Sequence, residues 1–240
     1  MKKKVFSLMM TLLLAFMGVA KAETVEIGTG SSGTTYYVPF NSLYGYSFTE
    51  QVFLASEIGA AGNITSISFK LGQSYSSEQT NQIALYMKNV SRSSFSSTSD
   101  YEAVTAGDIV YSGLWTIPAN YTGWVTITLD TPFAYDGTSN LLVAMHESTS
   151  GYSTRYFTYD AVTNGSVQWY SDSYNPDPYN LGSYSGSSYT RNYRSNIQLE
   201  MTAGGGQSGE ITIHARISPA ATAPAAPTSS FSQTNFMVRV

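Results

Sequence analysis

Apolar residues recur at every second position in several short segments of this chain, and this spacing constrains the fold more than any other feature. The clearest rows are residues 65–71, 83–87, 125–129, 141–145 and 197–201. Successive side chains of a β-strand point to opposite faces, whereas an amphipathic helix repeats every 3.6 residues. The rows therefore predict strands with one buried face and one wetter face, as in antiparallel sheets.

Weaker strands are expected at residues 24–27, 46–55, 109–112, 155–159 and 167–170. Asn164-Gly165 stands between the last two and predicts a hairpin turn. No segment reads as a capped amphipathic helix of useful length. About ten short strands predict an all-β fold, in which two antiparallel sheets pack as a β-sandwich of jelly-roll type.

The first 22 residues have the pattern of a signal peptide. Lys2, Lys3 and Lys4 precede an apolar run over residues 5–19, and Ala20-Lys21-Ala22 gives the small-x-small cleavage pattern. The run is too short for a comfortable membrane span, so the mature chain is expected to have none. The protein is predicted to be secreted or held at the cell surface.

The remaining chain divides into a predicted β-sandwich domain, residues 23–202, and a tail, residues 203–240. Gly204-Gly205-Gly206 opens the tail as a flexible linker, and a stretch rich in Ala, Pro, Thr and Ser follows. No second domain is expected in residues 207–240. A truncated gene and a free tail are both open interpretations.

Charge argues against two classes of partner. Residues 1–22 hold four of the 12 lysines and arginines and none of the 16 acidic residues, so the rest carries 8 basic and 16 acidic side chains. Such a surface does not suit nucleic acid or anionic lipid, which need basic residues. The chain has no cysteine and only two histidines, which excludes thiol chemistry and makes zinc an unsuitable cofactor.

Two motifs that could carry chemistry read more simply as structure. Gly28, Gly30 and Gly33 match G-x-G-x-x-G, but a dinucleotide site needs a helix next, and the β-prone sequence Thr34-Thr35 follows. A flexible loop is the preferred interpretation. His146 ends a strand without a partner pattern for a hydrolase, and a surface or packing role is expected for it.

A segment rich in Ser, Tyr, Asn, Gly and Pro, residues 170–192, is predicted to be a long loop and the best place for a ligand. Tyrosine and tryptophan rings stack on the apolar faces of sugars, and short polar side chains adapt around them. The alternative is that the rings pack against the sandwich. The candidate ligand-binding residues are Trp169, Tyr170, Tyr174, Tyr179, Tyr184 and Asn175.

Acidic residues of the same loop suggest two further ideas. Asp172 and Asp177, with Asn175, supply hard oxygens over a short span, so a structural calcium ion is one hypothesis; Asp136, Thr138 and Asn140 are a fainter version. A glycosidase pair is the other, but it needs rigid placement and an acid with a raised pKa. Turn formation is the preferred interpretation of these aspartates, and no cofactor is otherwise expected.

Several segments resemble a jelly-roll-like module found N-terminally in secreted surface proteins of Bacteroidetes. The resemblance covers residues 24–202 and rests on Tyr37-Val38-Pro39-Phe40-Asn41, residues 51–58, residues 64–69, Pro132-Phe133-Ala134-Tyr135 and residues 194–198. In that family, fibronectin type III or cleaved-adhesin-like domains often follow. The resemblance implies a non-catalytic role in adhesion or glycan binding.

The leading hypothesis is a monomeric, non-enzymatic binding module for a glycan or an extracellular protein, with the aromatic loop as its site. The second is an accessory or spacer module separated from a larger secreted hydrolase or protease. A catalytic domain in its own right ranks last.

Overall fold

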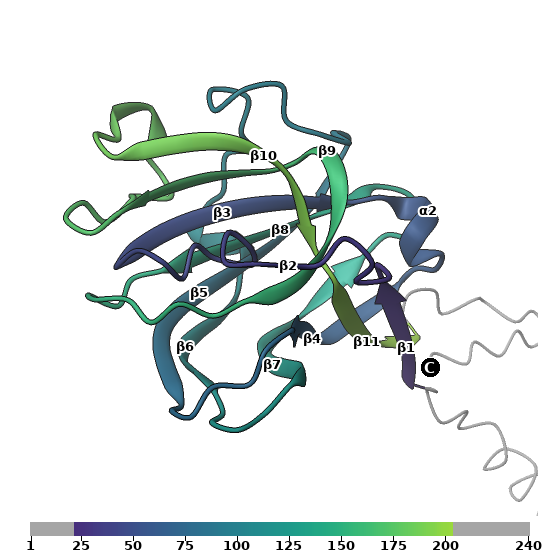
Figure 1. Cartoon of the computed structure of the whole chain (residues 1–240). Coiled ribbons are helices and arrows are strands. Elements are labelled where there is room, and N and C mark those ends of the chain that lie inside the picture. The colour runs from purple at the N-terminus through teal and green to yellow at the C-terminus, as the bar shows by residue number, and fades with distance from the viewer. Residues whose placement is uncertain (1–21, 204–240) are drawn as a thin grey trace, which may run out of the picture. The chain divides into compact units, whose positions relative to one another are not determined.

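The computed structural model describes residues 22–203, and within them the fold is almost entirely antiparallel β-structure (Figure 1). The predicted signal peptide and most of the predicted tail lie outside these residues. The strands are β1 (Ala22–Ile27), β2 (Thr34–Thr35), β3 (Tyr46–Phe53), β4 (Gly62–Leu71), β5 (Gln79–Val90), β6 (Ile109–Ile117), β7 (Gly123–Tyr135), β8 (Asn140–Glu147), β9 (Phe157–Ser171), β10 (Ser187–Ser195) and β11 (Ile197–Ala203). The short helical turns are α2 (Ala55–Ile58), η2 (Ala106–Asp108) and η3 (Leu181–Ser183).

The pairing divides ten of the 11 described strands into two groups, which β9 connects; the eleventh, β2, pairs only with β9. The first group runs β1–β11–β4–β7, and the second runs β10–β9–β3–β8–β5–β6. The beginning of β9 pairs with β2 and β4, whereas its end pairs with β3. Figure 1 shows β9 bending between these two halves, with β10 beside it.

The main apolar core takes side chains from both groups of strands. Phe69 and Ile127 come from the first group, and Leu85, Val143 and Met145 come from the second; all five are buried. On β7, Val125, Ile127 and Leu129 are buried while the residues between them are exposed, as the alternation predicts. A core shared in this way is what two packed layers produce, whereas the predicted jelly-roll connectivity stays a prediction.

A second apolar cluster lies on the other face of the second group. Phe48, Tyr86 and Trp169 from its strands pack with Phe95 and Leu181 from loops. The segments between β5 and β6 and between β9 and β10 therefore cover this face. The second sheet is buried on both sides over part of its area, which explains why Tyr86 on β5 is buried together with its neighbours Leu85 and Met87.

The prediction of a hairpin turn at Asn164-Gly165 is wrong. The two predicted strands, 155–159 and 167–170, are parts of one strand, β9, which begins at Phe157 and continues through the dipeptide. Asn164 has φ 53°, and the register against β10 shifts between Arg191 and Tyr193. A left-handed residue beside extra, unpaired residues makes a β-bulge, which bends a strand without reversing it.

The predicted long loop, residues 170–192, is also shorter than expected. β9 extends to Ser171, and β10 begins at Ser187, paired with Tyr170. The Ser- and Tyr-rich composition that suggests a loop suits an edge strand equally well, because β10 pairs on one side only.

Two turn glycines with positive φ allow a matched test of strain. Gly59 has φ +84° and open space where a Cβ would lie, whereas a Cβ on Gly137 (φ +76°) would lie 2.7 Å from the Ala61 nitrogen. Gly59→Ala should lower the free energy of unfolding by about 1 kcal/mol, and Gly137→Ala by about 2 kcal/mol, because backbone must also move. If urea unfolding showed the same loss of stability in both variants, the expected effect of the close contact at Gly137 would be contradicted.

Candidate functional site

The structure separates the predicted loop aromatics into buried and exposed rings. Trp169 and Tyr170 are only 2 % and 7 % exposed, whereas Tyr174 and Tyr179 are 57 % and 54 % exposed. Trp169 packs against Phe48 and Tyr101 in the second apolar cluster. A buried ring offers no face to a ligand, so the stacking role expected for Trp169 has no geometric basis here.

The loop over residues 172–186 is tied down by its own polar groups. The Tyr184 hydroxyl donates to the Tyr174 carbonyl oxygen at 3.0 Å, and the Tyr86 and Tyr179 hydroxyls lie 3.4 Å apart. His146 Nε2 lies 2.7 Å from Asn175 Oδ1. Burial lowers the pKa of His146, although the Asn175 contact opposes the shift. His146 therefore anchors the loop as a neutral ring, and the amide oxygen of Asn175 is already engaged.

The predicted metal ligands act as turn and loop acceptors. Asp172 Oδ1 accepts the Gly45 N–H at 3.1 Å, and Asp177 Oδ1 accepts the Tyr179 N–H at 3.0 Å. Asp136 accepts hydrogen bonds from Ser139 and Thr138, which lower its pKa to about 2. Across residues 22–203, no group of three or more His, Cys, Asp or Glu side chains could hold a metal ion. These contacts match the turn-forming interpretation and lend no support to calcium.

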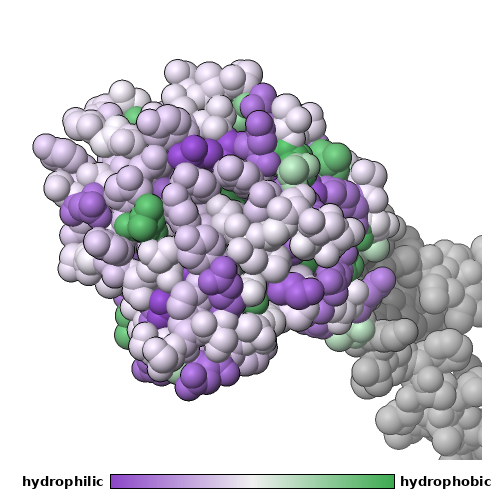
Figure 2. All heavy atoms as spheres, in the orientation of Figure 1, coloured by the Kyte–Doolittle hydropathy of each residue, from purple (hydrophilic) through white to green (hydrophobic). Residues whose placement is uncertain are grey.

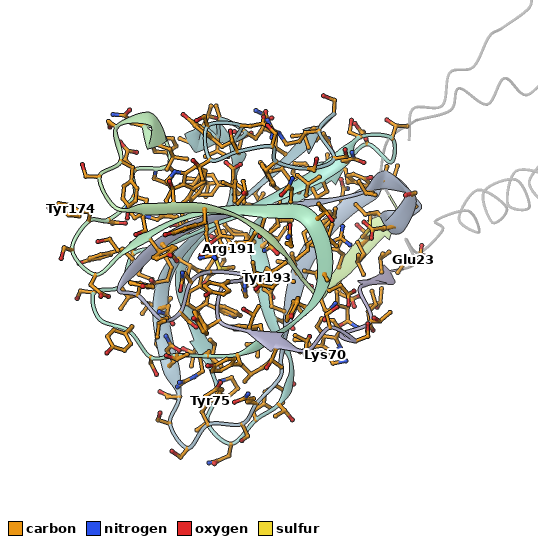
Figure 3. The ribbon with its side chains drawn as sticks, turned by 45° about the horizontal axis from the view of Figure 1, so that its top comes forward. Glu23, Lys70, Tyr75, Tyr174, Arg191 and Tyr193 are labelled. Atoms are coloured by element: carbon orange, nitrogen blue, oxygen red, sulfur yellow. The ribbon has the colours of Figure 1, made fainter. Side chains whose placement is uncertain are left out.

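The strongest cluster of aromatic side chains is a row of tyrosines around one arginine, here named the tyrosine–arginine stack. Its members are Tyr37, Tyr44, Tyr159, Tyr170, Tyr189, Arg191 and Tyr193. They come from the segment between β2 and β3, from both ends of β9, and from β10. Figure 3 shows Arg191 and Tyr193 near each other in the middle of the face turned to the viewer, with Tyr174 at its edge.

Arg191 lies at the centre of the stack. Its guanidinium carbon is 4.1 Å from the ring centroid of Tyr37 and 4.5 Å from that of Tyr189. The ring of Tyr193 is nearly parallel to that of Tyr37, with centroids 5.5 Å apart and an interplanar angle of 6°. Cation–π contacts of this kind are worth about 0.5–2 kcal/mol each, depending on how far they are desolvated. They hold the guanidinium in a fixed orientation.

The chain brings the stack together through buried polar contacts. The segment between β2 and β3 lies against β9 and β3, where the Asn41 amide donates to Gln168 Oε1 at 2.9 Å and the Asn41 N–H donates to the Ser47 hydroxyl. Ser42 and Arg155 exchange backbone and hydroxyl hydrogen bonds of 2.9 Å. These contacts place Tyr37 and Tyr44 over β10 and the end of β9.

Most of the stack is missed by the sequence-based prediction. Tyr170 is the only member of the stack that is also a predicted ligand-binding residue, and it is the most buried member of the stack. A signal does exist, because Tyr189, Arg191 and Tyr193 recur at every second position and so would share one face of a strand. Predicting residues 170–192 as a loop hides this periodicity.

The surface around the stack has little apolar area. Atoms of the face drawn in Figure 2 are mostly pale or violet, with green only in scattered places. Among the large hydrophobic side chains of the described residues, the exposed ones are Leu114 on β6 and five tyrosines: Tyr121, Tyr152, Tyr174, Tyr179 and Tyr189. A ligand on this face would meet rings with hydroxyl groups rather than aliphatic side chains.

Two carboxyl groups have strongly raised pKa values, but both lie inside the protein. Burial raises the pKa of Glu50 to about 8 and that of Glu147 to about 7. Their residues are 0 % and 1 % exposed. Glu50 accepts the Glu102 N–H, and Glu147 accepts hydrogen bonds from Asn81 and Thr149. Neither faces a substrate on the surface, so neither offers the accessible acid that a glycosidase needs.

The G-x-G-x-x-G segment is a loop, as the preferred interpretation expects. β2 follows it in place of a helix, and the Thr29 N–H donates to the Asp160 carboxylate at 2.8 Å. Without a helix N-terminus, no backbone N–H groups converge on a pyrophosphate.

No helix within the described residues has both the length and the apolar character required to cross a membrane. Comparison of the sequence with protein-family models gives no match, and comparison with curated proteins gives none either, so the resemblance to the Bacteroidetes surface module remains a prediction.

Proposed function

We propose that this protein is a secreted or surface-exposed, non-catalytic binding module that holds a glycan at the tyrosine–arginine stack. The observation that carries the proposal is the position of Arg191, which is held between two tyrosine rings with no carboxylate partner among residues 22–203. Tyrosine and arginine are the residue types that most often dominate binding energy, and a pre-ordered side chain loses little entropy when it binds.

Sugars suit this surface for two reasons. Tyr189 is 48 % exposed, and Tyr174 lies in the loop that starts beside Tyr170, so ring edges and hydroxyl groups are accessible near the guanidinium. The hydroxyl groups of a sugar need hydrogen-bond partners, and its apolar faces pack on aromatic rings. The site is then the edge formed by β10 and the neighbouring loop, rather than the whole of the loop.

Removal of the exposed ring of the stack should weaken binding. Tyr189→Ala is expected to reduce affinity for a bound polysaccharide by roughly 10-fold, the loss typical of an interface tyrosine. Tyr121→Ala is the matched control, because Tyr121 is also exposed (38 %) but makes no ring contact with the stack. Affinity electrophoresis of the purified protein in a panel of polysaccharides measures both variants. Equal retardation of both variants would contradict the assigned site.

One observation favours the spacer alternative. Trp169 and Tyr170 are buried, and the rings of the stack pack against one another, so part of the aromatic content serves the fold. A spacer would show no retardation in any polysaccharide, while Tyr189→Ala would lower only the thermal midpoint.

A further inference from the structure

We infer that the glycan held at the stack is acidic, with carboxylate or sulfate groups that pair with Arg191. This inference rests on the proposed glycan-binding function and names the chemical class of its ligand. It starts from a comparison of the ion pairs and hydrogen bonds that the described arginines make.

The arginines of the described chain fall into two classes. Arg92 pairs with Asp100 and Glu102, and Arg194 pairs with Glu57. Arg155 is buried and donates to two backbone carbonyl oxygens and a serine hydroxyl. Arg155 leaves its Nε without a partner, but each of these three side chains directs at least three hydrogen bonds at groups of the protein itself.

Arg191 differs from all three. Of its five N–H donors, one makes a hydrogen bond, from Nη2 to the Tyr170 hydroxyl at 3.3 Å. Its Nε is buried and has no partner. Burial raises the pKa of Tyr170, although Arg191 opposes the shift, so this phenol stays neutral and does not balance the charge. The guanidinium is thus a partly buried cation with donors to spare.

The chain has more acidic than basic side chains, so the inference concerns one local contact at Arg191 and not the broad basic surface that nucleic acid or anionic lipid needs. The geometry of the guanidinium selects the partner for this contact. Its planar fork matches the two oxygens of a carboxylate or sulfate, and such charge-assisted pairs are about twice as strong as neutral hydrogen bonds. The rings of Tyr37 and Tyr189 fix the plane of the fork before a ligand arrives. The tyrosine hydroxyls around it suit a sugar better than an apolar peptide side chain, which favours an acidic polysaccharide over an acidic protein.

The experiment compares polysaccharides that differ only in charge. Polygalacturonate carries carboxylates and its full methyl ester carries none, while dextran sulfate carries sulfates and dextran carries none. We expect the purified protein to bind polygalacturonate, dextran sulfate or both, and to bind the two neutral polymers at least 10-fold more weakly. Binding should also fall as salt rises from 0.05 to 0.5 M. The two charged polymers show which acidic group is preferred.

Variants test whether Arg191 is the partner. Arg191→Gln should weaken binding to the acidic polymer roughly 10- to 100-fold, the usual value of a charged hydrogen bond. Arg191→Lys keeps the charge but loses the fork, so it should recover only part of the affinity. Lys70→Gln is the matched control, because Lys70 is another cation without an acidic partner among residues 22–203 and lies over Trp124, outside the stack. Thermal midpoints show that each variant is folded.

The outcomes distinguish this inference from the function on which it rests. Equal binding of charged and neutral polymers would overturn the inference and leave glycan binding in place. Loss of binding in Lys70→Gln but not in Arg191→Gln would also overturn it, by moving the anionic contact elsewhere. Binding to no polysaccharide, with capture of an acidic peptide instead, would overturn both proposals.

Discussion

Glu50→Gln is expected to remove most of a fall in stability that the unmodified protein undergoes as the pH rises from 5 to 9. Glu50 lies on β3, is fully buried beneath the segment that contains Glu102, and leaves its Oε1 without a partner. Burial raises its pKa from 4.5 to about 8, although the Glu102 N–H, Arg92 and Lys88 partly oppose the shift.

The direction follows from proton binding. Between pH 4.5 and about 8 the folded protein keeps the proton on Glu50, whereas the unfolded chain has lost it. The contribution of Glu50 to stability is therefore fully present below pH 4.5 and declines by about 1.4 kcal/mol per pH unit up to the folded pKa, a total on the order of 3–5 kcal/mol. Glu147, with a pKa of about 7, adds a smaller fall that ends near that pH.

Urea unfolding at pH 5, 7 and 9 measures this effect. Glu50→Gln should flatten the dependence over the whole range, Glu147→Gln should flatten only its lower part, and Glu26→Gln, an exposed glutamate on β1, should leave it unchanged. A slope in Glu50→Gln as steep as in the unmodified protein would show that Glu50 is not the buried acid responsible.

Glu57→Ala is expected to lower the free energy of unfolding by about 3 kcal/mol, more than removal of the arginine that it pairs with. Arg194 on β10 is buried; its Nη1 and Nη2 donate to the two Glu57 carboxylate oxygens at 2.8 and 2.6 Å, and its guanidinium lies over Phe53. Loss of Glu57 leaves a buried positive charge without a partner.

Arg194→Met should cost only about 1–2 kcal/mol, because methionine keeps the contact with Phe53 and the partly exposed Glu57 can regain water. The double variant should resemble Arg194→Met alone, since Glu57 then has no charge to balance. Additive losses in the double variant, measured by urea unfolding, would mean that the ion pair contributes little.

The fold class could be predicted because the evidence for it is local. Alternating residues on β4 and β7 report directly which face of each strand is buried. The bend in β9 could not be predicted in the same way. Asn164-Gly165 has the composition of a hairpin turn, and only the pairing with β10 and the Phe95 N–H bound to the Asn164 carbonyl oxygen make it a bulge.

The candidate site was harder still to predict from sequence, because it depends almost entirely on tertiary contacts. Tyr37, Tyr159 and Arg191 lie far apart in the sequence, and tertiary contacts alone bring them together. A search for aromatic residues within one continuous segment finds Trp169, but its burial depends on which segments cover it, and that is a property of the assembled fold. The alternation of Tyr189, Arg191 and Tyr193 is the part that sequence alone could have supplied.

β9 pairs with strands of both groups, and this affects how the protein unfolds. If β3 and β10 separated from β9 while the first group stayed folded, β9 would expose a long row of unpaired N–H and C=O groups, which favours aggregation. Because the main apolar core takes side chains from both groups, loss of one group also removes core contacts of the other. Residues 22–203 should therefore unfold in a single cooperative step. A longer protein that contains this module should need all of these residues for it to fold.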